Sequence, residues 1–279
     1  MRVLVLLLLA ACLPPPVYRV QRDVRVAHAA APLWSGSPMQ GPVEASFGAS
    51  TLAETRAPKI GDDPTVASEV PSRQVRGELR FRYMHYGQLA LIHDHAISSS
   101  YRALDPTQAP VDHGTAQSLG IAIRAAIPVE GVPGLSIGFG VELLQWWLPY
   151  VEYRSCVANC DGEPAQEMTT GEDTLVEPAM QLIPSYRTGH VTLFAGIYAT
   201  PHARVERKGT EYSSIDYDSE ITRSTANFIV HAGAEVTFGY VSVLAQVQQD
   251  LVRDPVSYGP SLGVALAVHA PESLPLTTN

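Results

Sequence analysis

Apolar and polar residues alternate along most of the chain from residue 43 onwards. In the segments 119–127, 135–143 and 241–247, every second side chain is apolar, and the residues between are small, polar or charged apart from Leu244. A period of two predicts β-strands with one apolar face. The connections between these segments are alternately long and short, which indicates hairpins whose two ends face different environments. The pattern therefore predicts an all-β fold of consecutive antiparallel strands.

Ten such strands can be counted. They cover residues 43–52, 75–85, 89–98, 116–127, 135–148, 176–187, 190–204, 226–238, 241–252 and 258–269. A count of eight, without 43–52 and 89–98, preserves the alternation of connections equally well. We favour ten because the segments around Gly87 and Gly239 share one order: a strand, a turn glycine and a new apolar run.

After the amino-terminal residues, no stretch approaches the ~18 consecutive apolar residues of a membrane helix. A chain of this pattern can cross a bilayer only as a closed barrel, because open sheet edges leave backbone groups unpaired in hydrocarbon. Over residues 43–269 the architecture resembles the small outer-membrane β-barrels of bacteria, which are up-and-down antiparallel transmembrane barrels. The resemblance implies an outer-membrane location, with short turns and both termini in the periplasm. Such barrels commonly finish on a terminal aromatic, whereas here a tail, 270–279, follows His269.

The first residues have the features of an export signal. Arg2 precedes an apolar run, residues 3–9, and the tetrad Leu9-Ala10-Ala11-Cys12 follows at once. This tetrad resembles the lipobox of bacterial lipoproteins, which implies that residues 1–11 are removed as a signal peptide and that the Cys12 thiol is lipidated. Leu13 is compatible with sorting to the outer membrane. Residues 12–41, rich in proline and alanine, are expected to form a flexible tether.

The other two cysteines, Cys156 and Cys160, lie in a polar stretch between residues 149 and 175. In an exported chain this spacing favours a disulfide in an exposed loop. The alternative is half of a metal site, but the sequence has no second cysteine pair and no nearby histidine to complete four ligands.

Charged side chains alternate with the apolar ones and are expected to face the lumen. Barrels of this size have narrow interiors that side chains nearly fill, so charges of both signs must pair there. The turn positions predict Arg80 opposite Asp94, and they place Arg124 and Glu142 opposite glycines, Gly138 and Gly120. A structural ion-pair plug is the favoured interpretation and a narrow pore the alternative. The predicted lumen charges are Glu78, Arg80, Arg82, Arg124, Glu142 and Glu235, with Glu44, His231, Gln246, Gln248 and Asp250 on the same face.

Aromatic residues gather at the outer end of the fifth predicted strand, where a membrane girdle would lie. They are Trp146, Trp147, Tyr150 and Tyr153.

One constellation has the residue types of a hydrolase site: His93-Asp94-His95, followed by serines 98–100. Adjacent residues of a strand point to opposite faces, however, so Asp94 cannot orient either histidine. No motif of lipid A deacylases or of outer-membrane aspartyl-type proteases matches these positions. A two-histidine metal site with Asp112 or His113 would still need a third ligand. We therefore predict no catalytic residue, no metal site and no cofactor.

The chain has a net charge of −9 and a pI near 5.4, which argues against a nucleic-acid partner. The long connections are acidic, with six acids against one arginine between residues 149 and 175. The expected partners are outer-membrane lipid and, through these loops, lipopolysaccharide or a surface partner. The sequence thus favours a non-enzymatic envelope protein of structural or surface-interaction type. A narrow channel, a barrel enzyme acting on lipid or peptide, and a soluble lipoprotein β-domain are the alternatives.

Overall fold

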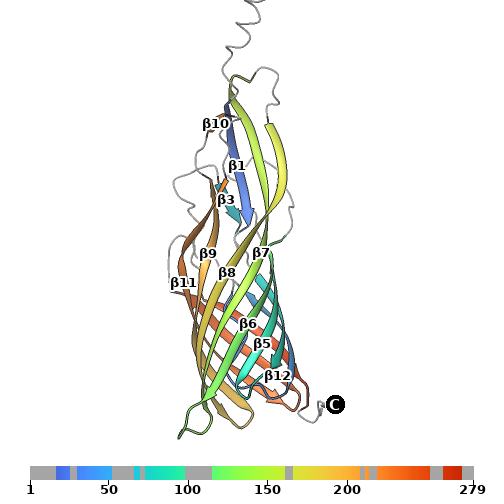
Figure 1. The fold of residues 1–279 in the computed structure, drawn as a ribbon, viewed down its shortest axis with the longest axis vertical. Helices are drawn as coiled ribbons and strands as arrows, with labels where there is room; N and C mark the ends of the chain where they lie inside the picture. The colour runs from blue at the N-terminus through green and yellow to red at the C-terminus, as the bar shows by residue number, and fades with distance from the viewer. Residues whose placement is uncertain are drawn as a thin grey trace, which may run out of the picture.

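A computed structural model of the chain describes residues 17–25, 30–51, 66–69, 73–97, 115–160, 166–207, 211–213, 219–251 and 260–271. Ten antiparallel strands close into one barrel (Figure 1), which confirms the ten-strand prediction. No helix in these ranges is long and apolar enough to span a membrane. Around the ring the strands are β2 (Val43–Thr51), β4 (Arg73–Arg82), β5 (Gly87–Ile97), β6 (Gln117–Pro128), β7 (Leu135–Ala158), β8 (Gln166–Thr188), β9 (Val191–Arg207), β11 (Ser219–Phe238), β12 (Val241–Asp250) and β13 (Ser261–His269), and β13 pairs with β2.

The outer wall of the barrel is apolar. Each strand alternates between an exposed apolar side chain and a buried one that faces the lumen, as in the burial pattern of β13. In water such a continuous apolar surface would be a liability, whereas in hydrocarbon it is favourable. A soluble β-domain would need the opposite arrangement, so that alternative is wrong. The exposed set includes the predicted Ile121, Ile123, Ile137, Phe139, Val243 and Val247.

All four short turns lie at one end of the barrel, at the bottom of Figure 1. They span residues 83–86, 129–134, 189–190 and 239–240, and β2 begins and β13 ends at this same end. Gly189 and Gly239 each have φ of 58°, which a two-residue hairpin beginning with glycine requires. We call this the short-turn end and the opposite one the long-loop end.

Exposed aromatic side chains form a girdle at the short-turn end: Tyr83, Tyr86, Tyr186, Phe238 and Tyr240. Of the aromatic residues predicted to form a girdle at the outer end of the fifth predicted strand, only some face outward as expected. Trp146 lies fully buried in the lumen, because even-numbered residues of β7 face inward, while Trp147 is half-buried on the outward face. The side chains of Tyr150 and Tyr153 lie outside the described set.

Strands β7 and β8 continue well beyond the barrel (Figure 1). They stay paired as far as Ser155 and Gln166, so most of the stretch 149–175, which we expected to be a loop, is a β-hairpin. The expectation failed because this hairpin lies outside the closed barrel, where no wall separates hydrocarbon from lumen and no alternation of apolar and polar residues is required.

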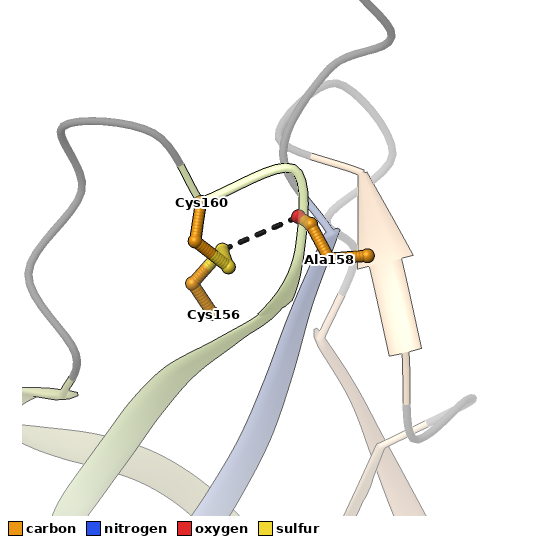
Figure 2. Close-up of a disulfide and its surroundings, with 3 residues drawn as sticks. All are labelled: Cys156, Ala158 and Cys160. Carbon is orange, nitrogen blue, oxygen red and sulfur yellow. Dashed lines mark hydrogen bonds between the residues drawn. A yellow bond between two sulfur atoms is a disulfide. The ribbon is translucent and has the colours of Figure 1, made fainter.

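The predicted disulfide is present at the tip of this hairpin, between Cys156 and Cys160 (Figure 2). The reversal between them uses Asn159, whose φ of 56° lies in the left-handed region that asparagine tolerates. The Cys156 sulfur lies 3.3 Å from the Ala158 carbonyl oxygen. This is a close contact rather than a hydrogen bond, because a disulfide sulfur has no hydrogen to donate.

The residues before β2 differ from the flexible tether that we expected. Strand β1 (Val17–Arg25) pairs with the upper part of β7, and with the short strands β3 (Val66–Glu69) and β10 (Glu211–Ser213). Residues 30–36 are then buried inside the barrel. The chain reaches the short-turn end and there enters the barrel wall as β2.

Candidate functional site: the occupied lumen

Residues 30–41, which we call the lumen segment, cross the barrel from the long-loop end to the short-turn end. At the upper level, the Ala30 amide donates to Gln74 Oε1 over 2.6 Å and the Ala31 amide to Gln248 Oε1 over 2.9 Å. Gln246 Nε2 donates back to the Ala31 carbonyl over 3.2 Å. These glutamines lie on β4 and β12, so the segment is held from two sides of the ring.

The lower part of the segment is also bound to the wall. Arg80 donates to the Leu33 carbonyl over 3.0 Å, and Gln88 donates to the Ser37 carbonyl over 3.5 Å. Near the short-turn end, Gln40 Nε2 donates to Thr237 Oγ1 over 2.9 Å. The order of these contacts fixes the direction of threading.

Close approach of the backbone depends on two glycines. Gly36, with φ of 72°, lies against Gly138 of β7, where an added Cβ would come within 2.6 Å of the Gly36 Cα. A side chain at residue 138 would therefore displace the segment.

Apolar side chains of the segment complete the core of the lumen. Leu33 and Trp34 pack in a cluster with Ala126, Ile183, Phe194, Leu244 and Ala265. Ala31 joins a second cluster that contains Trp146, Tyr198 and Ile229. The interior is thus a packed core in which the segment is one of the elements.

Between these clusters lies a network of ion pairs around Arg124, whose side chain is fully buried. Its guanidinium donates to both oxygens of Glu78, over 2.8 and 3.0 Å, and to Glu142 over 2.6 Å. The same guanidinium lies 5.2 Å from the ring centroid of Trp34, which places a cation over an aromatic of the lumen segment.

Arg76 and Asp94 extend the network across β4 and β5. Arg76 donates to both Asp94 oxygens, over 2.7 and 3.0 Å, and its third nitrogen lies 3.4 Å from Glu142. Asp94 also accepts from Gln74 over 2.8 Å and from Ser118 over 3.0 Å. The carboxylate is therefore fully engaged by neighbours in the wall.

Arg80 joins the network to the short-turn end. It donates to Glu78 over 2.7 Å and pairs with Glu44, whose other oxygen lies 2.8 Å from His269 Nδ1. Three arginines thus face four carboxylates within one buried network, and no member is more than 5% exposed.

The predicted lumen charges fall into two groups. Glu78, Arg80, Arg124 and Glu142 are buried inside, whereas Arg82 and Glu235 are half-buried near the short-turn end. Glu235 lines small cavities beside Trp34, each of about 10 Å³, which is room for about one water molecule.

Sequence reasoning missed Arg76 and paired several residues wrongly. Asp94 lies opposite Arg76, not Arg80, because the hairpin between β4 and β5 is centred near residue 85 and not at Gly87: Arg82 pairs with Gln88.

The β6–β7 pairing is also shifted. Arg124 lies opposite Gly140, and Glu142 lies opposite Ala122. Each partner is two residues along the strand from the glycine that we predicted, because Pro128 pairs with Ser136. A glycine still faces Arg124: a Cβ on Gly140 would come within 2.8 Å of the Arg124 side chain.

The His93-Asp94-His95 triplet forms no catalytic arrangement. Asp94 points into the lumen, His93 Nδ1 lies 2.9 Å from the Ser118 carbonyl, and His95 Nε2 lies 3.1 Å from Thr115 Oγ1. Among the residues that the structure describes, no group of three or more metal-ligating side chains comes together. Asp112, His113 and serines 98–100 lie outside those residues, as does Cys12.

No protein-family model and no curated protein matches the chain. Among solved structures it is similar to LpxR from Salmonella typhimurium, with 6% identity and a TM-score of 0.38 over 81% of this chain and 100% of that one. It is also similar to the translocator domain of autotransporter NalP from Neisseria meningitidis, with 10% identity and a TM-score of 0.42 over 97% and 95% of the two chains. The transport unit of the autotransporter AIDA-I from Escherichia coli gives 10% identity and a TM-score of 0.31, over 82% and 89%. At these values the likeness carries no argument about function.

Proposed function

We propose that this protein is a non-conducting barrel of the outer membrane that acts as a structural or surface-interacting envelope protein. The apolar wall and the aromatic girdle support placement in a bilayer. Short turns at one end and long connections at the other support an orientation with the long-loop end outside. The acidic connections at that end supply a surface for a partner or for lipopolysaccharide.

The observation that carries the proposal is the occupied lumen. A channel needs a continuous path for water and ions, but here the lumen segment is hydrogen-bonded to the wall at three levels and packed in both apolar clusters. The ion-pair network packs against Trp34 through Arg124 and leaves only small cavities beside this ring. No observation favours the narrow-channel alternative, and the geometry of His93 and Asp94 gives no support to an enzyme.

Planar-bilayer recording tests this proposal. The wild-type protein should show little or no steady current. Trp34→Ala, which removes the largest side chain of the lumen segment, should give at most brief current steps. Phe47→Ala removes an aromatic that faces outward, 64% exposed, and should be as silent as the wild type. A large, stable wild-type conductance would overturn the proposal.

A further inference from the structure

Strand β1 lies beyond the membrane on the long-loop side. On β7 the outward apolar side chains begin near Leu135 and end near Trp147, twelve residues later. At about 3.3 Å per residue and a tilt near 40°, this stretch rises about 30 Å, which spans the apolar layer. The part of β7 that pairs with strand β1 runs from Tyr150 to Ala158, above that layer.

The direction of β1 shows how the chain reaches this position. Val17 lies opposite Ala158, at the far tip, and Val24 lies opposite Tyr150, close to the barrel mouth. The chain therefore runs toward the barrel along β1. It is next described at Ala30, already buried in the lumen, and it emerges at the short-turn end.

We propose that the barrel delivers its own amino-terminal region to the outer face of the membrane. The lumen segment is the threaded stem, and the paired strand β1 holds the region that precedes it at the surface. This inference rests on the proposed function, which sets the long-loop end outside.

The inference changes what a lipid on Cys12 would do. Val17 lies five positions after Cys12, a reach of at most about 18 Å. Val17 stands about 28 Å above the level of Trp147, by the same rise per residue and tilt. While β1 is paired, a lipid on Cys12 therefore cannot reach the inner leaflet of the membrane, and an inner-leaflet anchor and the threaded arrangement exclude each other.

Labelling of whole cells with a membrane-impermeant maleimide tests this placement in the full-length protein. Val17→Cys is the test variant, Thr169→Cys marks the long-loop end, and Tyr240→Cys marks the short turn between β11 and β12. Mass spectrometry of the labelled peptides identifies which cysteine has reacted. We expect Val17→Cys and Thr169→Cys to react in intact cells, and Tyr240→Cys only after the outer membrane is permeabilised.

A second probe does not depend on one side chain: an epitope tag inserted directly before Val17 should bind antibody on intact cells. If Thr169→Cys reacts from outside while the tag and Val17→Cys are reached only after permeabilisation, threading is wrong and the proposed function stands. If Thr169→Cys is itself reached only after permeabilisation, the proposed orientation fails as well.

Discussion

Replacing Arg124 by methionine should be among the most damaging single changes in the barrel. Methionine keeps most of the length of the side chain and removes its charge and its donors. The three hydrogen bonds to Glu78 and Glu142 are lost, and two arginines are left to balance four buried carboxylates. Breaking a buried ion pair from one side costs about 3–5 kcal/mol, and we expect a loss of this size in the free energy of unfolding.

Urea unfolding of the detergent-solubilised protein, followed by tryptophan fluorescence, measures this loss. Arg73→Met is the matched control, because Arg73 is exposed on the same sheet, and it should cost less than about 1 kcal/mol. In a double-mutant cycle, Arg124→Met combined with Glu142→Gln should cost less than the sum of the single changes. If Arg124→Met costs no more than Arg73→Met, the lumen network does not stabilise the fold and the reasoning fails.

Three further predictions concern the wall, the hairpin tip and the amino terminus. Ile123→Arg, in the middle of the apolar belt, should lower the unfolding free energy by about 2–4 kcal/mol. Gln145→Arg, on the outward face near the end of the belt, should lower it by at most about 1 kcal/mol. Equal losses for the two variants would argue against a membrane-embedded wall. Cys156 and Cys160 should both resist thiol labelling until a reductant is added, and free thiols in the native protein would contradict the disulfide. Cys12→Ala should abolish incorporation of labelled fatty acid and still leave an assembled barrel in the membrane fraction; recovery of the variant as a soluble periplasmic protein would show that the lipid is the anchor.

The strands could be predicted from the sequence because the wall separates two environments. Between Leu119 and Ile127 each residue faces either hydrocarbon or the lumen, so apolar residues recur at every second position of the sequence. Beyond the membrane this constraint ends, and the extension of β7 to Ala158 left no comparable signal. The residues that lie opposite each other on neighbouring strands were predicted less well, since a small shift in the position of a turn changes every pair along both strands. The turn between β4 and β5 is centred near residue 85, two residues before Gly87, and Asp94 therefore lies opposite Arg76.

The lumen segment could not be found by the same reasoning. Residues 30–41 form no strand and have no period, because each contacts a different part of the wall. The one available signal was the apolar pair Leu33 and Trp34 inside a stretch rich in proline, glycine and serine, which a solvated tether does not need. The glutamines that hold the segment, such as Gln74 and Gln248, look in the sequence like any other inward-facing polar residue.

The threaded lumen constrains the order in which the protein folds. The first and last strands of the barrel, β2 and β13, pair with each other, so their pairing is the step that closes the ring. The lumen segment is synthesised before all ten strands, and it ends inside the ring that they form. Were the ring to close first, the chain ahead of residue 30 would have to be pushed through an interior in which Arg124 and Trp146 already pack. Closure around a segment already in place avoids that obstacle, and it gives the buried arginines and carboxylates their last neighbours in the same step. Pairing of β2 with β13 is then the last step of assembly. After this step the lumen segment can no longer leave the barrel through a gap between these two strands.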